Sequence, residues 1–191
     1  MADDSPPSQR ILLVTGLSGA GKSTALQVLE DLGWETIDNF PIRLLGGLVA
    51  GSDANTRLAI GFDSRTRGFV PQEIIALCKQ FEARDDIELT TLFIDCTSAE
   101  LERRYNETRR PHPMARGRTA LDGIKAEREL LDPLRRWSDT VIDTSDYAAN
   151  QLQQVVRERF AENAEPGMSV TVSSFGFARG MPPLADLMFD M

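Results

Sequence analysis

The sequence contains few of the residues that form disulfides, metal sites and membrane spans. Its 191 residues include one histidine and two cysteines. Cys78 and Cys96 lie in apolar surroundings without C-x-x-C spacing, so we expect both to be reduced core residues. No apolar run approaches the roughly 18 residues of a membrane span, and no secretory leader pattern opens the sequence. These features predict a cytoplasmic location and no membrane contact.

The overall charge argues against one further class of partner. The formal net charge is −8, with 41% hydrophobic and 26% charged residues. An acidic surface disfavours broad, non-specific binding of nucleic acid, while the apolar content is sufficient for a packed core. The length corresponds to one ordinary domain, or to one domain plus a short additional piece.

One segment, Gly16-Leu-Ser-Gly-Ala-Gly-Lys-Ser23, fills every fixed position of the phosphate-binding loop pattern. Its glycines allow successive backbone N–H groups to turn toward a phosphate. Lys22 is placed to reach the β- and γ-phosphates, and the Ser23 hydroxyl to help hold Mg²⁺. An apolar strand pattern precedes the loop at 10–15, and a helical apolar stripe follows at 25–32. The segment predicts binding of a nucleoside triphosphate by Gly16, Leu17, Ser18, Gly19, Ala20, Gly21, Lys22 and Ser23.

Apolar strand patterns alternate with amphipathic helix patterns along most of the chain. Such alternation predicts an α/β fold, a P-loop NTPase whose parallel sheet is flanked by helices. The further predicted strands are 34–38, 57–63, 89–95, 140–143 and 169–175, and the main further helices cover 71–81, 120–137 and 152–160.

Three aspartates end predicted strands and are candidates for a second Mg²⁺ ligand: Asp38, Asp63 and Asp95. The carboxyl ends of parallel strands line the ligand crevice of an open sheet, which favours all three. The pattern alone favours Asp95, because an apolar and β-branched run leads directly into it. An aspartate that only caps the following turn is about as common.

Arginine is concentrated in one region, which is interrupted by Pro111, Pro113 and Gly117. We interpret this region as a lid or anion site that closes over the triphosphate. The alternative is a solvated helix end followed by a basic surface loop. His112 lies within the region, and we expect it to be a surface residue rather than a general acid. The clustered arginines are Arg103, Arg104, Arg109, Arg110, Arg116 and Arg118.

With these motifs, the chain resembles the RapZ/YvcJ family of P-loop nucleotide-binding proteins, also called RNase adapter proteins. The matching segments are GLSGAGKS (16–23), IDNFP (37–41), FDSR (62–65), RRYNETRRPHP (103–113), VIDTS (141–145) and SSFGFARGMP (173–182). The resemblance implies a kinase-like P-loop fold that binds ATP and GTP and hydrolyses them slowly.

The family's second nucleotide-binding segment corresponds to Asp63, Ser64, Arg65 and Thr66. That correspondence moves our choice of second Mg²⁺ ligand from Asp95 to Asp63. Thr66 departs from the residues found at this position in other members, so its role is the least secure of the four.

The resemblance also bears on domain organisation. We expect a flexible tail at 1–9, a P-loop nucleotide-binding domain at 10–165, and at 166–191 the start of a C-terminal module that is truncated here. RNA binding in the family is ascribed to that C-terminal domain, so we do not expect it of this chain.

Together these observations predict a regulatory or adapter domain that is a weak ATPase or GTPase, with a protein partner that reads its nucleotide state. Two alternatives remain: a small-molecule kinase that uses the arginine-rich lid, and a nucleotide sensor without hydrolysis. The preference between ATP and GTP, the partner and a homo-oligomeric state stay open. The residues predicted to act in hydrolysis are Lys22, Ser23, Asp63, Arg109 and Arg110, with Mg²⁺ held by Ser23 and Asp63.

Overall fold

The computed structural model describes residues 9–51, 56–108 and 110–161. The predicted tail, the predicted strand at 169–175, the predicted C-terminal module and Arg109 fall outside the described residues.

The centre of the fold is a sheet of five strands in the order β2-β3-β1-β4-β5, with every neighbouring pair parallel. On β1, Leu12 is aligned with Ala59 of β3 on one side and with Thr90 of β4 on the other. The strand that leads into the glycine-rich loop is therefore the central one. The strands are β1 (Gln9–Gly16), β2 (Glu35–Ile37), β3 (Arg57–Gly61), β4 (Ile87–Asp95) and β5 (Thr140–Asp143).

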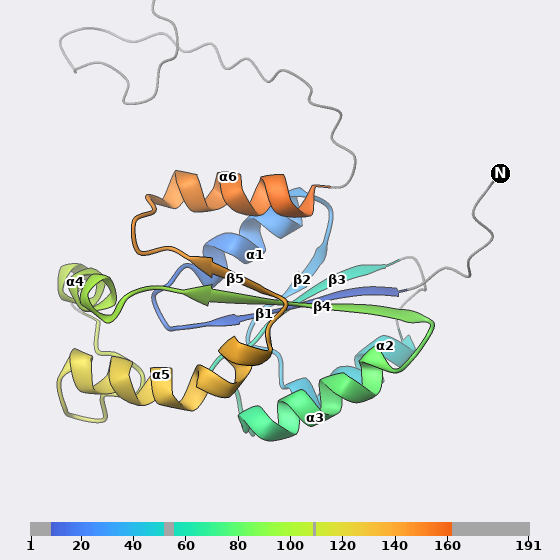
Figure 1. Ribbon diagram of the computed structural model, residues 1–191, viewed down its shortest axis with the longest axis horizontal. Helices are drawn as coiled ribbons and strands as arrows, with labels where there is room; N and C mark the ends of the chain where they lie inside the picture. The colour runs from blue at the N-terminus through green and yellow to red at the C-terminus, as the bar shows by residue number, and fades with distance from the viewer. Residues whose placement is uncertain (1–8, 52–55, 109, 162–191) are drawn as a thin grey trace, which may run out of the picture. The chain divides into compact units, whose positions relative to one another are not determined.

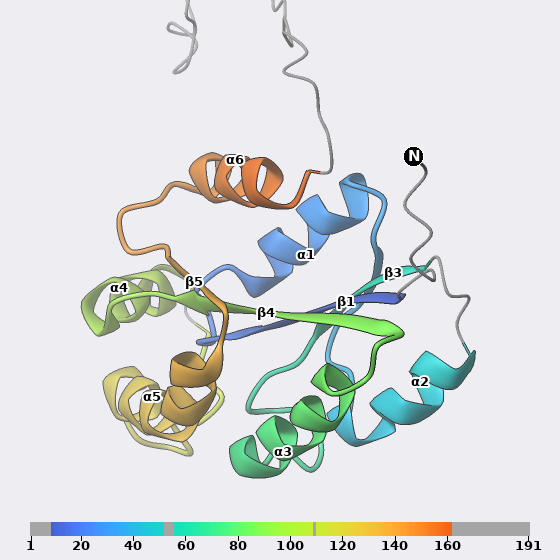
Figure 2. The same cartoon turned by 45° about the vertical axis from the view of Figure 1, so that its right-hand side comes forward.

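Helices cover both faces of the sheet, as Figures 1 and 2 show: α1 and α6 lie on one face, and α2, α3 and α5 on the other. Helix α4 lies beyond the C-terminal end of β4 (Figure 1). The helices are α1 (Lys22–Asp31), η1 (a 3₁₀ turn, Ile42–Leu44), α2 (Leu45–Gly51), α3 (Pro71–Glu82), α4 (Ser98–Thr108), α5 (Ala120–Trp137) and α6 (Ala149–Phe160).

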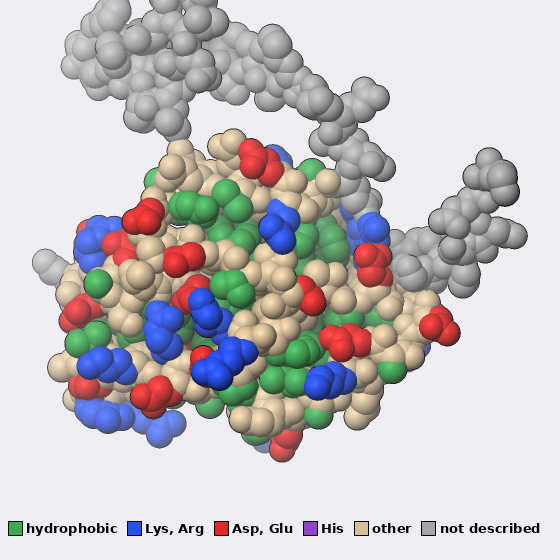
Figure 3. All heavy atoms as spheres, viewed as in Figure 1, with side chains coloured by type: hydrophobic (Ala, Val, Ile, Leu, Met, Phe, Trp, Pro, Cys, Tyr) green, Lys and Arg blue, Asp and Glu red, His purple; other side chains and the backbone are tan. Residues whose placement is uncertain are grey.

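The sequence explains this layering. Residues 11–14 of β1 and 92–94 of β4 are at most 1% exposed, because a parallel sheet covered on both faces buries successive side chains. Helix α5 begins with a capping box in which Thr119 and Asp122 each accept a backbone N–H of the other. On the outside, acidic and basic side chains are interspersed over the face drawn in Figure 3, without a field of one sign.

The fold predicted from the sequence is confirmed. The predicted strands at 34–38 and 57–63 are shorter in the structure, so Asp38 and Asp63 lie just past β2 and β3, at the end of the sheet that carries the loop. Within the described residues, no helix is long and apolar enough to cross a membrane.

Candidate phosphate-binding site

The glycine-rich loop connects the end of β1 to the first residue of α1 and depends on its glycines. A Cβ on Gly16 would lie 2.3 Å from the Ile94 carbonyl oxygen of β4, so the approach of the two strands excludes a side chain. Gly19 and Gly21 have φ values of +89° and +114°, which L residues rarely adopt. The turn from β1 into α1 therefore depends on backbone conformations with positive φ, which glycine adopts readily.

The amides of the loop fall into two groups, those that donate within the protein and those that find no acceptor among the described residues. Leu17 donates to Ile94 at 3.1 Å and Ala20 donates to the Leu17 carbonyl at 3.0 Å. The amides of Gly19 and Gly21, and those of Lys22 and Ser23 at the start of α1, donate to no acceptor among residues 9–51, 56–108 and 110–161. Free amides at a helix N-terminus, where the helix dipole is positive, are the groups that bind phosphate.

Lys22 is the charged group of the loop, and its side chain is only 8% exposed. Its ammonium forms an ion pair with Asp38 and lies 3.8 Å from Asp63 Oδ2. Two carboxylates thus balance the lysine that the sequence assigns to the β- and γ-phosphates.

The segment from Asp63 to Thr66 is built around the Asp63 carboxylate, which is 1% exposed. Arg65 donates to it from its backbone at 2.9 Å and from its guanidinium at 2.7 Å. Burial would raise the pKa of Asp63, but the hydrogen bonds from Arg65 and the charges of Arg65 and Lys22 outweigh burial and lower it. Thr66 accepts the Asp63 amide and donates to Asn39 at 3.0 Å, which links the segment to the turn after β2.

Asp95, the acid that the pattern favoured, has a different environment. Its carboxylate oxygens accept from Arg128 at 3.1 Å and from Arg135 at 2.7 Å, both on α5. Asp38 and Asp63 therefore lie beside the Lys22 ammonium, whereas the ion pairs of Asp95 connect β4 to α5.

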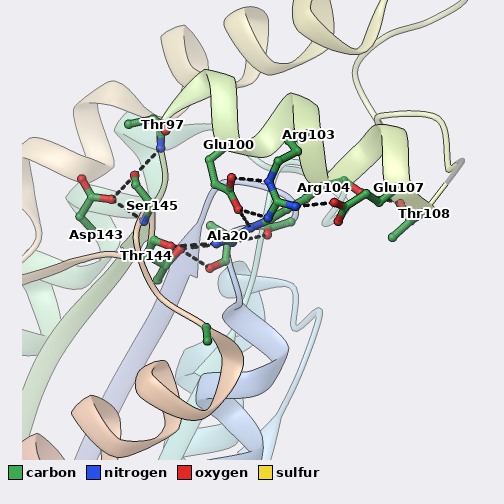
Figure 4. A network of polar contacts seen from close by, with 12 residues as sticks. Ala20, Thr97, Glu100, Arg103, Arg104, Glu107, Thr108, Asp143, Thr144 and Ser145 are labelled. Carbon is green, nitrogen blue, oxygen red and sulfur yellow. Dashed lines mark hydrogen bonds and ion pairs between the residues drawn. The ribbon is translucent and has the colours of Figure 1, made fainter. Parts of the chain in front are cut away.

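The arginine cluster divides into residues with distinct surroundings. Arg103 is exposed and pairs with Glu100 and Glu107 on its own helix, whereas Arg104 reaches across to the loop (Figure 4). Arg104 donates to the Gly19 carbonyl at 3.2 Å and to the Thr144 carbonyl at 2.8 Å. The Thr144 hydroxyl in turn donates to the Ala20 carbonyl at 2.8 Å. The side chains of Arg110, Arg116 and Arg118 are exposed.

The expectation of a surface histidine was wrong. His112 is 2% exposed, and its Nε2 lies 3.2 Å from Oε2 of Glu127, which is fully buried in α5. The histidine fits beside α5 because the helix carries Gly123 at that point. A Cβ there would lie 2.5 Å from His112 Nδ1.

Glu127 is a residue of this site that the sequence reasoning missed. Its carboxylate accepts hydrogen bonds from Ser18 of the loop and from Ser64. The available signal was its position among Ile124, Leu131 and Leu134, which form the buried face of α5. A glutamate within an apolar stripe is rarely buried without partners.

The parallel five-stranded sheet, the glycine loop at the end of its central strand and the lysine at the start of α1 define a P-loop domain of the kinase-like type. Solved structures of this type are similar in fold. A shikimate kinase from Acinetobacter baumannii matches with a TM-score of 0.53 at 17% identity, over 83% of this chain and 97% of its own. A fungal RNA kinase matches with a TM-score of 0.51 at 14% identity, over 83% of this chain and 89% of its own.

Within that class, the chain belongs to the family described as the RapZ-like N-terminal domain, which matches residues 9–164. A protein of Erythrobacter litoralis named "Nucleotide-binding protein" is 72% identical over 184 residues, which are 95% of this chain and 61% of the relative. A protein of the same name from Novosphingobium aromaticivorans is 58% identical over 197 residues, covering 100% of this chain and 64% of the relative. The chain thus spans less than two thirds of the length of these relatives.

Proposed function

We propose that the chain binds a nucleoside triphosphate at residues 16–23 and hydrolyses it slowly, as a regulatory domain. The observation that carries this proposal is the set of amides of Gly19, Gly21, Lys22 and Ser23, which donate to no acceptor within the described residues, next to the Lys22 ammonium, which pairs with Asp38 and Asp63. A triphosphate would replace Asp38 as the partner of Lys22. The names of the relatives, nucleotide-binding proteins, support the binding part of this proposal.

The proposed metal is Mg²⁺, held by the Ser23 hydroxyl and Asp63. No group of three or more potential metal-binding side chains occurs among the described residues. One hydroxyl and one carboxylate suit Mg²⁺, which binds with phosphate, water and one or two carboxylates. Asp63 fits because it lies beside Lys22 with a lowered pKa and so remains ionised. Arg65 holds both of its oxygens, and we therefore propose that Asp63 contacts the metal through water. Bound Mg²⁺ would neutralise charge on the phosphates.

The remaining assignments follow from the predicted site. Ser64, Arg65 and Thr66 line the phosphate site beside Asp63. We propose that Arg109 or Arg110 approaches the γ-phosphate when the arginine-rich region closes, a role compatible with the exposed position of Arg110. Both ATP and GTP are proposed substrates, and a protein partner is proposed to read the nucleotide state. RNA binding is proposed only for a C-terminal domain outside residues 1–165.

The test compares wild type, Lys22→Ala and Lys79→Ala, the last an exposed lysine on α3 that serves as the matched control. We would measure nucleotide affinity and phosphate release with Mg²⁺, from ATP and from GTP. Binding and slow release that persist in Lys79→Ala and vanish in Lys22→Ala are the expected result. Equal behaviour of all three proteins would refute the assignment. Tight binding without release would favour the nucleotide sensor.

A small-molecule kinase is a second candidate, favoured by a hollow beside Thr66. It is lined by Arg43 and Arg67, together with Glu73 and the apolar residues Ile42, Phe69, Ile74 and Leu77. Two arginines near a phosphate site suit an anionic acceptor. A phosphorylated product formed from a pool of anionic metabolites, and lost in Arg43→Ala, would support this function over hydrolysis.

A further inference from the structure

The carboxylate of Glu127 is surrounded by four donors from three distant segments of the chain. Oε1 accepts from the Ser18 hydroxyl at 2.7 Å and from the Ser64 hydroxyl at 2.6 Å. Oε2 accepts from the Ser18 amide at 2.9 Å and lies 3.2 Å from His112 Nε2. A carboxylate has about four acceptor sites, and all of them are filled here.

The contacts of His112 and Glu127 indicate the tautomer of the histidine and the charge of the carboxylate. The Met114 amide donates to His112 Nδ1, so the proton of a neutral ring is on Nε2 and points to Glu127. Burial would raise the pKa of Glu127, but hydrogen bonds from His112, Ser64 and Ser18 outweigh burial and lower the pKa. Glu127 is thus a buried carboxylate whose charge is stabilised by hydrogen bonds from three segments.

The Ser18 amide differs from its neighbours in the loop. The amides of Gly19, Gly21, Lys22 and Ser23 find no acceptor in the described part of the chain, whereas the Ser18 amide is held by Glu127. The first third of the loop is consequently fixed to α5, while the part nearest α1 stays available to a ligand.

We propose that Glu127 is a positioning residue for the phosphate site. It holds the loop at Ser18, the segment that carries Asp63 at Ser64, and the arginine-rich region at His112 in one fixed arrangement. This inference rests on the proposed nucleotide function for its catalytic consequence. The group does not touch the substrate, because it is fully buried and its acceptor sites are occupied.

Glu127 contacts the segments proposed to act in hydrolysis, but not the groups proposed to bind the phosphates. The free amides and Lys22, which would bind the phosphates, have no contact with Glu127 among the described hydrogen bonds. Ser64, which precedes Arg65 and follows Asp63, is held by Glu127 directly. Loss of Glu127 should therefore misplace the metal-binding segment and the arginine-rich region more than the phosphate-binding amides. Displacements of about 1 Å can cost on the order of 100-fold in rate.

The experiment uses the full chain with Mg²⁺-ATP, and compares Glu127→Ala, Glu127→Gln and the control Glu129→Gln, an exposed glutamate on the same helix. We expect kcat to fall at least about tenfold in Glu127→Ala, with the nucleotide Kd changed less than about threefold. Glu127→Gln should restore most of kcat, because its oxygen can accept from the Ser18 amide and His112 while its NH₂ donates to the two hydroxyls. If Glu127→Ala does not fold, Ser64→Ala removes the link to Asp63 alone and should lower kcat about three- to tenfold.

Hydrogen exchange of the ligand-free protein tests the same inference without nucleotide. Glu127→Ala, or Ser64→Ala in its place, should exchange faster at 16–19, 63–66 or 110–118 while β4 is unchanged. The proposal would be overturned if these variants kept the kcat and the exchange rates of the wild type. It would also be overturned if exchange were accelerated evenly over the chain, or if nucleotide affinity and melting temperature fell together. Failure of wild type to bind any nucleotide would instead refute the proposed function, and the exchange result would then decide the role of Glu127.

Discussion

Replacement of Gly16 by alanine tests how closely the loop approaches the sheet. The new Cβ would lie 2.3 Å from the Ile94 oxygen and 2.9 Å from its nitrogen, and both are backbone atoms of β4. Ordinary contact begins at 3.4 Å, so the strands must separate by roughly 1 Å, an overpacking that costs about 1–3 kcal/mol. The φ of +152° adds about 1–3 kcal/mol of backbone strain for alanine. Loss of the Leu17–Ile94 hydrogen bond adds about 1 kcal/mol.

Together these contributions predict a loss of about 3–7 kcal/mol, a large part of the roughly 5–15 kcal/mol that stabilises a typical domain. The melting temperature should fall by about 6–28 °C for a chain of this size. Urea unfolding followed by circular dichroism measures the loss, with Gly47→Ala as the control. Gly47 is exposed in α2 with nothing within 4 Å of a Cβ, so alanine there should be neutral or stabilising by up to about 1 kcal/mol. A Gly16→Ala protein within 1 kcal/mol of wild type would refute the reasoning.

Three further predictions concern charge and burial. The lowered pKa values of Asp63 and Glu127 imply that their stabilisation is complete above the unfolded pKa values of about 4 and is lost as the pH falls through the folded values. The free energy of unfolding should therefore decline below about pH 4, and an increase between pH 5 and pH 3 in urea titrations would contradict this. Arg104→Met should cost about 1–3 kcal/mol, because it removes the guanidinium donors to the Gly19 and Thr144 carbonyls. The exposed Arg103→Met should have no measurable effect on unfolding, and equal losses in the two variants would be inconsistent with the structure. Burial raises the pKa of Cys78 to about 12, so its thiol should resist alkylation at pH 8 in the folded protein and react after unfolding.

Much of the fold was predictable because its signals are local. The run from Arg10 to Thr15 is largely apolar because β1 is covered on both faces. The glycines of the loop predict the turn that follows this strand. The helix predicted at 120–137 has the same limits in the structure, since Thr119 caps its start and Ser138 ends it. Each of these features depends on residues adjacent in sequence.

The environments of single side chains in the site were less predictable, because they depend on packing between distant segments. His112 between two prolines resembles a surface residue until Gly123 of α5 is seen to make room for it. Nothing in their spacing separates Arg103 from its neighbour Arg104, although only the second faces Thr144. The residue that could have been found is Glu127, from its position on the apolar face of its helix.

The contact between the loop and α6 has a consequence for synthesis of the chain. A Cβ on Gly21 would lie 2.5 Å from Leu152 Cδ2, which shows how tightly the last described helix closes over the start of α1. These two positions belong to opposite ends of the described chain, and β1 itself pairs with two strands that are made after it. On the ribosome, β1 and the loop are made before α6, so the packing of Leu152 against Gly21 can form only after α6 has emerged. This contact on the loop is therefore among the last of the described domain that synthesis allows to form.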